Sequence, residues 1–343
     1  MSTKPPTLTD VAKFAGVSLS TVSRVVEDST KVTAATRDKV KAAMQEIGYY
    51  GNAAARQLVS GSSSTIGIIT SSTSHYGYSR TIEGIEAEAR KAGTATLIAV
   101  ADNESDEAVR QAISIVVSQN PAGVLILDFD DIGSAVLGAI PKHLATVAVT
   151  SAGRTNPEVV SICIDDYAGG YNLGKHLISQ GHRSIFMIGP NDFPQQGTRS
   201  DGVAKALREA RLPQYPSFQA DDWFPASGYK VATEILENYG ERVTAIICGN
   251  DELAVGAMRA IAEKNLRVPQ DVSCAGFDDH HVSAYLPTAL TTIRQDFKQL
   301  GTNAYQLLTE VITDKEAPPK MTVIEPTLIA RESTGEANLN RGF

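Results

Sequence analysis

The sequence predicts an all-α helix-turn-helix unit at the N-terminus, followed by an α/β core of two doubly wound lobes with parallel sheets. Three observations carry this prediction. Apolar residues recur at helical spacing, with capping residues, through the first fifty positions. From residue 65 onward, short apolar runs alternate with longer helical stretches, which is typical of parallel α/β sheets. Finally, 343 residues exceed what one hydrophobic core usually holds, so two or three domains are expected.

Composition places the chain among ordinary globular proteins. It is 42% hydrophobic and 20% charged, and no apolar run approaches the roughly 18 residues that a membrane-spanning helix needs. The polar N-terminus shows no secretory signal, so we expect a cytoplasmic protein. The three cysteines, Cys163, Cys248 and Cys274, are far apart and lie in apolar stretches, which indicates buried thiols rather than a metal or redox site.

Charge is unevenly distributed along the chain. Residues 1–61 contain eight Lys and Arg against five Asp and Glu, a net charge of +3, so the remainder must carry −11 to give the overall −8. A small basic unit on an acidic body is typical of contact with nucleic acid at one end. A modest basic excess on a short helical segment is also compatible with an ordinary solvated surface.

The first two helices are predicted close together. Thr9 is expected to cap the first helix, and Gly16 permits the sharp reversal that follows it. Ser18 is expected to cap the second helix, over residues 19–26. The outer face of this second helix carries small, polar and basic side chains, which suit a groove of base edges and phosphates: Leu19, Ser20, Thr21, Ser23 and Arg24.

A third helix is predicted over residues 34–47, capped by Thr33 and ended by Gly48. Three helices would also fit a small bundle without a DNA role, but two closely spaced helices with a polar second helix favour helix-turn-helix. The pattern closely resembles the headpiece of the LacI/GalR (lactose-repressor) family of bacterial transcriptional regulators. The strings that carry the resemblance are Thr9-Asp10-Val11-Ala12, Ala15-Gly16-Val17-Ser18, Thr21-Val22-Ser23-Arg24-Val25 and Thr36-Arg37-Asp38-Lys39-Val40.

The resemblance implies that the second helix enters the major groove of DNA. Leu19 and Ser20 fall at the family's main specificity positions, and Arg24 at its base-contacting arginine. An arginine that binds guanine through two hydrogen bonds gives about 1–3 kcal/mol of discrimination. The DNA-binding residues expected in the headpiece are Leu8, Thr9, Ser18, Leu19, Ser20, Thr21, Ser23, Arg24, Thr33, Thr36 and Tyr49.

Residues 51–64 resemble the family's hinge helix and linker. The helix would be shorter than ten residues, so it is marginal in isolation. The resemblance implies that it folds when two protomers bind DNA, with Asn52 and Ala55 in contact and Leu58 wedged into the minor groove. The alternative is a Leu58 that packs on the core. The family usually has proline where this chain has Gly51, so we expect a less stable hinge helix.

The core over residues 65–335 is predicted from alternating elements. Two runs of five or six strands indicate two doubly wound lobes. Ligands of such folds bind at the carboxyl ends of the strands, so the cleft between the lobes is the expected ligand site. The predicted strands cover 65–70, 97–100, 124–127, 147–150, 159–163, 184–188, 245–248 and 272–275. The predicted helices cover 79–91, 107–118, 132–139, 168–180, 196–211, 226–239 and 251–264.

The family resemblance extends over essentially residues 8–335, and it implies a core similar to the periplasmic sugar-binding proteins. Arg199 matches the family's effector-gripping arginine, and Asn250 and Asp278 match its polar anchors. Each also has a structural explanation, such as a cap for Asp278 or packing for an aromatic residue. Together with the loop after the first strand, the resemblance gives these effector-binding residues: His75, Gly77, Tyr78, Ser79, Arg199, Trp223, Asn250, Asp278, Gln295 and Phe297.

Two departures bear on the effector. Where the lactose-binding member of the family has an arginine and an aspartate in the first lobe, this chain aligns Asn103 and, roughly, Thr150. A lactose-type galactoside is therefore not expected. A pentose, another hexose, a polyol or a nucleoside stays open.

We therefore expect a repressor that binds double-stranded, palindromic operator DNA as a homodimer, is nucleoid-associated, and is released by a small sugar-like effector. The alternative is a corepressor-dependent repressor or an activator that responds to a nucleoside, a purine or another metabolite. The tail, residues 336–343, has no heptad pattern, so we expect a dimer rather than a tetramer.

Neither enzyme activity nor a cofactor, a metal or a membrane contact is expected. The sequence contains no phosphate-binding loop, nucleophile elbow or HExxH motif. Adjacent His280 and His281 would point apart, and Asp102, Glu104 and Asp106 lack the glycine and the distal glutamate of a calcium loop.

Overall fold

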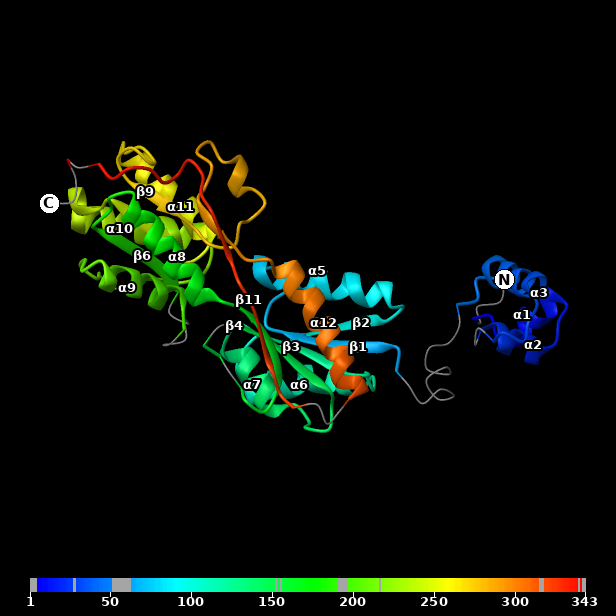
Figure 1. The fold of residues 1–343 in the computed structure, drawn as a ribbon. Coiled ribbons are helices and arrows are strands. Elements are labelled where there is room, and N and C mark those ends of the chain that lie inside the picture. The colour runs from blue at the N-terminus through cyan, green and yellow to red at the C-terminus, as the bar shows by residue number, and fades with distance from the viewer. Residues whose placement is uncertain are drawn as a thin grey trace. The chain divides into compact units, whose positions relative to one another are not determined.

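The chain divides into two compact units, residues 1–64 and residues 65–343 (Figure 1), which we call the headpiece and the core. The computed structural model describes residues 5–26, 29–50, 63–151, 153–154, 156–190, 197–215, 217–314, 318–338 and 340. The predicted hinge contacts Asn52, Ala55 and Leu58 lie outside these residues. None of the described helices is long and apolar enough to cross a membrane.

The headpiece contains three described helices, α1 (Leu8–Ala15), α2 (Leu19–Val26) and α3 (Ala34–Glu46). The prediction of a Thr9 cap was wrong: Thr7 caps α1 and forms a capping box with Asp10. Gly16 ends α1 in the left-handed region, at φ 60°. Apolar stripes from all three helices meet in one small core, which contains Val11, Ala12, Ala15, Val22, Val25, Val40 and Ala43.

The first lobe of the core contains a parallel six-stranded sheet in the order β11-β5-β4-β3-β1-β2. Its strands are β1 (Thr65–Thr70), β2 (Ala95–Val100), β3 (Val124–Asp128), β4 (Thr146–Ser151), β5 (Val160–Ile164) and β11 (Met321–Ile324). Helices α5 (Tyr76–Lys91) and α12 (Phe297–Thr313) pack on one face, and α6 (Asp106–Val117) and α7 (Asp131–Ala139) on the other. Strands covered on both faces are continuously apolar, and for that reason most of them could be predicted.

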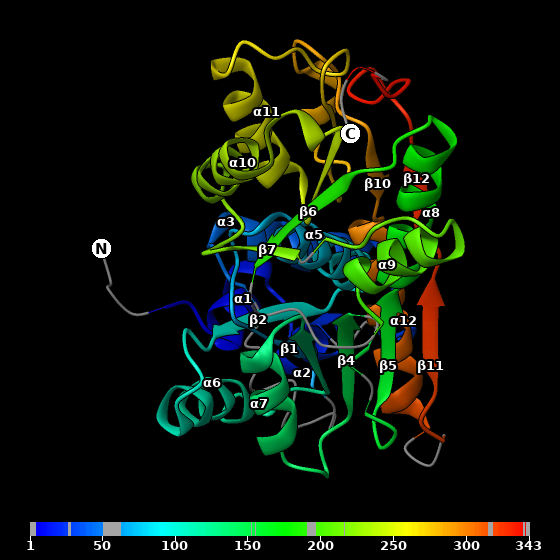
Figure 2. The same ribbon diagram turned by 90° about the vertical axis from the view of Figure 1, so that its left-hand side faces the viewer.

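The second lobe contains a parallel four-stranded sheet in the order β7-β6-β8-β9, of which Figure 2 labels β7 and β6. Its strands are β6 (Ile185–Pro190), β7 (Ser217–Ala220), β8 (Ala245–Cys248) and β9 (Ser273–Ala275). Helices α8 (Asp166–Ser179) and α9 (Arg199–Glu209) cover one face, and α10 (Pro225–Tyr239) and α11 (Asp251–Glu263) the other. Short 3-10 turns follow at Gly240–Arg242 and Ser283–Tyr285.

The expected five or six strands in the second lobe were therefore wrong for the described residues. The next segment, β10 (Thr292–Arg294), instead pairs with β12 (Thr327–Ile329) in a separate antiparallel ribbon. Isolated bridges, at Ala275–Thr291 and Asp278–Arg294, link residues 291–294 to the end of β9 and the segment that follows it.

The chain passes between the two lobes three times (Figure 1). The crossings run from β5 to α8, from β10 to α12, and from β11 to β12. Residues that follow β5 or precede α12 consequently lie where the two lobes meet.

Helix pairs in the core approach closely through glycines. A Cβ added to Gly202 on α9 would lie 2.6 Å from the backbone nitrogen of Tyr171 on α8, and one added to Gly170 on α8 would lie 3.0 Å from the Cα of Arg199. The contact places the N-terminal ends of α8 and α9 side by side, and these ends carry Asp166 and Arg199.

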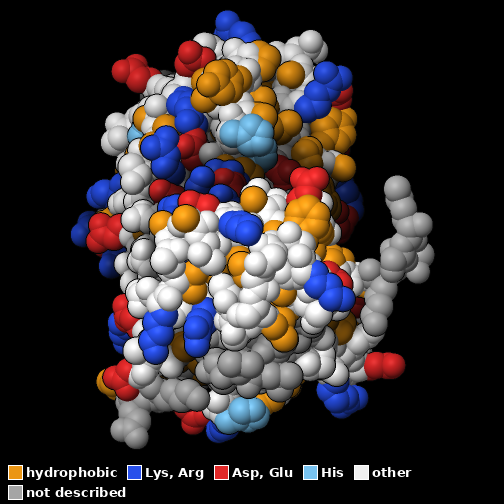
Figure 3. All heavy atoms as spheres, turned by 90° about the vertical axis from the view of Figure 1, so that its right-hand side faces the viewer, with side chains coloured by type: hydrophobic (Ala, Val, Ile, Leu, Met, Phe, Trp, Pro, Cys, Tyr) orange, Lys and Arg blue, Asp and Glu red, His pale blue; other side chains and the backbone are white. Residues whose placement is uncertain are grey.

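Large apolar side chains reach the surface on both edge strands of the first sheet. Ile98 and Val100 are exposed on β2, and Met321 and Val323 on β11. On the face drawn in Figure 3, hydrophobic side chains likewise show among basic and acidic ones. Edge strands with apolar side chains are natural sites for association with another chain.

Candidate functional site

The headpiece presents the side chains expected to contact DNA. Leu19 is 50% exposed on α2, and Ser20 and Arg24 are also exposed. Ser18 caps α2, because its hydroxyl accepts from the backbone N–H of Thr21 at 3.1 Å. An exposed leucine on an otherwise polar helix face has no packing partner inside the headpiece core, which is consistent with contact to something outside it.

Other predicted contacts are also placed by the headpiece fold. The hydroxyl of Thr33 caps α3 and donates to Thr36 at 2.9 Å, while Thr9 is exposed. Leu8 and Tyr49 are half-buried and pack against the headpiece core. These last two side chains therefore have a structural role whatever else they contact.

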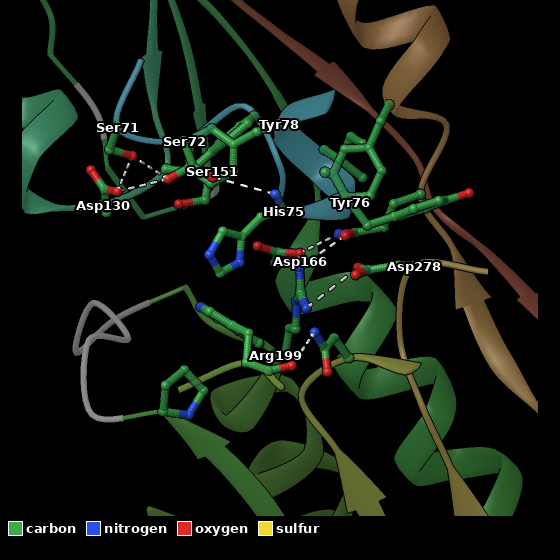
Figure 4. A pocket seen from close by; sticks show the side chains of 18 of the residues that line it. Ser71, Ser72, His75, Tyr76, Tyr78, Asp130, Ser151, Asp166, Arg199 and Asp278 are labelled. Atoms are coloured by element: carbon green, nitrogen blue, oxygen red, sulfur yellow. Dashed lines mark hydrogen bonds and ion pairs between the residues drawn. The ribbon is translucent and has the colours of Figure 1, made fainter. Parts of the chain in front are cut away.

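A cavity of about 360 Å³ lies between the two lobes of the core (Figure 4). Nine of the ten predicted effector-binding residues line it: His75, Gly77, Tyr78, Arg199, Trp223, Asn250, Asp278, Gln295 and Phe297. The exception is Ser79, whose hydroxyl donates to the carbonyl of Tyr76 at 3.0 Å and which is not among the lining residues. Residue 79 lies one turn into α5, where a serine can satisfy its hydroxyl within its own helix.

A buried network centred on Arg199 forms the floor of the cavity. Its Nε donates to Asp166 at 3.0 Å, one terminal nitrogen donates to Gln295 at 2.8 Å, and the other donates to the carbonyl of Gly249. Gln295 in turn donates to Asp166. The nearby carboxylates raise the pKa of Arg199 against the effect of burial, so the guanidinium stays charged.

Asp278 faces this network from the segment after β9 (Figure 4). Its Oδ1 lies 3.7 Å from the guanidinium of Arg199 and accepts no hydrogen bond from any described residue, although Asp278 is only 9% exposed. Its backbone lies at φ 103°, a conformation that side-chain-bearing residues rarely adopt. Burial raises the pKa of Asp278 to about 6, so the side chain is mostly an ionised acceptor at neutral pH. A buried acceptor of this kind needs a donor from outside the protein.

Neighbouring residues hold the second-lobe wall in place. Asn250 caps α11 through the backbone N–H of Leu253 at 2.8 Å, and its amide donates to the carbonyl of Trp223 at 3.1 Å. Asp251 accepts from the backbone N–H of His280 at 2.7 Å and from the hydroxyls of Ser283 and Thr292, both at 2.6 Å. Asp251 thereby positions the loop that carries Asp278.

The first-lobe wall contains a carboxylate that the sequence analysis missed. Asp130 lines the cavity, caps α7, and accepts from the hydroxyls of Tyr78, at 2.7 Å, and Ser71. Thr150 also lines the cavity, whereas Asn103 does not. The available signal was position, because Ser71, Asp130 and Asp166 each lie within two residues of the end of a strand in a parallel sheet.

The cavity is also rich in aromatic side chains. They include Tyr76, Tyr78, Phe129, Trp223 and Phe297. Flat apolar faces combined with a few fixed polar groups suit a small ligand that has both C–H faces and hydroxyl or amide groups. Among the described residues, no group of three or more His, Cys, Asp or Glu side chains is arranged to hold a metal ion.

Comparisons with known proteins agree with this geometry. Residues 7–52 match the family described as bacterial regulatory proteins, lacI family, and residues 175–334 match a periplasmic binding protein-like domain. The lactose operon repressor of Escherichia coli K12 is 33% identical over 335 residues, which cover 96% of this chain and 91% of the relative. The HTH-type transcriptional repressor PurR of Photorhabdus laumondii is 33% identical over 331 residues, 95% of this chain and 96% of the relative.

Solved structures are similar over nearly the whole chain. The lac repressor dimer bound to operator and the anti-inducer ONPF matches with a TM-score of 0.81 and 32% identity, covering 97% of this chain and all of that one. The complex of the transcriptional regulator CelR with cellobiose matches with a TM-score of 0.69 and 28% identity, covering 96% and 99%. The chain therefore belongs to the lacI family of bacterial regulatory proteins and is a DNA-binding transcriptional repressor with a periplasmic-binding-protein-like core.

Proposed function

We propose that this repressor binds a palindromic operator as a homodimer and is released by a small sugar-like effector in the cavity between the lobes. The observation that carries the effector proposal is Asp278. Its buried Oδ1 accepts from no donor among the described residues, while Arg199 and the ring of Trp223 flank the same space. Hydroxyl groups supply such donors, and aromatic rings pack on the C–H faces of sugars.

The DNA contact is assigned to α2 and its neighbours. Leu19 and Ser20 would read base edges, Arg24 would bind a guanine, and the hydroxyls at the starts of α2 and α3 would bind phosphates. The proposed DNA contact is completed by the hinge, through Asn52, Ala55 and Leu58.

Association of two copies is supported by the exposed edge of the first sheet. Ile98 and Val100 are alternate residues of β2, so they project from the same side of the edge strand, and both are exposed. A related repressor of known structure is a dimer on its operator. Two headpieces on two half-sites would match a palindromic sequence.

Release follows from the position of the cavity between the lobes. An effector that contacts both lobes favours one arrangement of the lobes over another. It can shift operator binding only if it binds the DNA-binding arrangement and the released arrangement with different affinities. A coupling free energy of about 1–3 kcal/mol corresponds to a 5- to 150-fold change in operator affinity.

The test begins with selection of binding sites from random double-stranded DNA by the full-length chain. We expect a site with two inverted half-sites, and release from it by one of a panel of pentoses, hexoses, disaccharides and polyols. Nucleosides and purines complete the panel, because a compound that tightens DNA binding would support the corepressor alternative. Failure of every compound to alter operator binding would contradict the proposed effector.

The headpiece assignment is tested with Arg24→Ala. The variant should bind the selected operator at least tenfold more weakly, because a base-contacting arginine is lost, while Trp223 fluorescence still reports effector binding. Lys41→Ala is the matched control, since it removes the same charge from an exposed position on α3. Equal losses in both variants would mean that Arg24 contributes only general charge.

A further inference from the structure

The charges around the cavity are strongly unequal. Among the described lining residues there are six carboxylates, one guanidinium and no lysine. The carboxylates are Asp130, Asp166, Asp221, Asp222, Glu252 and Asp278. A ligand that enters this space meets a field that opposes negative charge.

The single guanidinium is already engaged. Arg199 uses its three nitrogens on Asp166, Gln295 and the carbonyl of Gly249, and Asp278 lies 3.7 Å away. Two carboxylates therefore compensate its charge. A phosphate or carboxylate group of a ligand would have to displace these partners and leave them buried without a cation, which is costly.

Acceptors stand on both lobes. Asp130 lies on the first-lobe side of the cavity and Asp278 on the second-lobe side, and Figure 4 draws them at opposite ends of the pocket. The charge of Asp130 is stabilised by hydroxyls of Ser71 and Tyr78 and by the backbone N–H of Gly133 at 2.8 Å, at the N-terminus of α7. A carboxylate offers about four acceptor positions, so Asp130, which already accepts from three donors, has room for one more, and the Oδ1 atom of Asp278 has no donor among the described residues.

A cationic ligand is disfavoured at the second-lobe end. The guanidinium of Arg199 lies close to Asp278, so an ammonium group placed on Asp278 would contact a positive charge already there. Hydroxyl groups avoid both conflicts.

We infer, resting on the proposed function, that the effector is an uncharged polyhydroxylated compound whose hydroxyls donate to Asp130 on the first lobe and Asp278 on the second. Phosphorylated and carboxylated derivatives of the same skeleton are rejected. For a phosphate or carboxylate, one repulsive contact with a carboxylate at a partly buried site lowers the affinity by on the order of a thousandfold.

The experiment uses the full-length chain and matched sets of compounds, with binding followed by calorimetry. Ribose is compared with ribose 5-phosphate, and glucose with glucose 6-phosphate and glucuronate. Xylose, cellobiose and xylitol extend the neutral set. We expect a neutral compound to bind and its phosphorylated and carboxylated derivatives to bind at least a hundredfold more weakly. If a charged derivative binds more tightly than its parent and alters operator binding, the proposed function stands and this inference is wrong. If no compound in either set binds, both are wrong.

Asp130→Asn tests the first-lobe acceptor. Asparagine is an equally good helix cap, so α7 should persist, and the melting temperature should change little. We expect the neutral compound to bind about tenfold more weakly. The ratio between the affinities for the neutral and the phosphorylated compound should become smaller. Asp131→Asn is the control, because that neighbouring carboxylate is 65% exposed and does not line the cavity. An unchanged ratio in Asp130→Asn would overturn the role of Asp130.

Discussion

The contact between α8 and α9 offers a direct test of how packing supports the cavity. Gly202 lies on α9 one turn after Arg199, and a Cβ added there would lie 2.6 Å from the backbone nitrogen of Tyr171 and closer still to the carbonyl oxygen of Tyr167. Ordinary van der Waals contact for a Cβ begins near 3.4 Å. Both obstructing atoms belong to the backbone of α8, so no side chain can rotate out of the way.

The magnitude follows from the shift that the contact demands. Gly202→Ala must separate the two helices by more than about an ångström, and overpacking of this kind costs about 1–3 kcal/mol of unfolding free energy. Because the obstruction is rigid backbone, we expect about 3 kcal/mol. Gly138→Ala is the matched control, because Gly138 lies in α7 and an added Cβ would have no atom of the described residues within 4 Å. There the lower conformational freedom of alanine should stabilise the protein by about 0.5–1 kcal/mol.

Urea unfolding of the full-length chain would measure both variants by far-UV circular dichroism and by fluorescence of Trp223, the single tryptophan, which lies in the second lobe. Gly202→Ala should lower the midpoint and also weaken effector binding, because the same helix contact sets the position of Arg199. A Gly202→Ala variant within 0.5 kcal/mol of the parent, or a Gly138→Ala variant that loses stability, would refute the packing argument.

Three further outcomes are expected. Burial lowers the pKa of His182 from 6.5 to about 4, so the folded state is fully stable above pH 6.5 and loses about 3 kcal/mol of unfolding free energy as the pH falls toward 4. The loss of unfolding free energy between pH 7 and pH 5 should therefore be smaller in His182→Asn than in the parent, and equal losses would contradict this. Burial raises the pKa of Asp278 to about 6, so effector affinity should fall below pH 6 as the acceptor becomes protonated, and calorimetry should find this dependence gone in Asp278→Asn. Asp251→Ala removes the acceptor for three donors, so it should weaken effector binding at least tenfold, whereas Ser283→Ala should have a smaller effect.

Most of the regular structure could be predicted because its local signals are strong. Strands such as β3 are buried on both faces and read as uninterrupted apolar runs, and α2 has a capping serine and a clear apolar stripe. The cap of α1 was misplaced because two threonines lie two residues apart, and only the capping box with Asp10 distinguishes them. No elements were predicted after residue 275. The strands there have three or four residues and are too short for alternation to be recognised, but α12 has 17 residues and a buried apolar stripe, a helical signal that the prediction overlooked.

The residues that line the cavity could be predicted better for the second lobe than for the first. Family motifs identified Arg199 and Asp278, but no motif marks Asp130, which becomes visible only when the sheet brings the end of β3 beside the end of β1. Ser79 shows the opposite error, because proximity in sequence to lining residues does not settle which way a side chain on a helix points.

The positions of the buried polar residues bear on how a bound effector could act at a distance. Asp166 lies at the crossing from β5 to α8, and Gln295 lies at the crossing from β10 to α12. Because Arg199 bonds to both and Gln295 bonds to Asp166, two of the three connections between the lobes are tied to one guanidinium before any effector binds. These segments would therefore move together rather than bend one at a time. In the proposed function, a ligand hydroxyl that donates to Asp278 would compete with Arg199 for this carboxylate, so it would act where two of the three connections between the lobes meet.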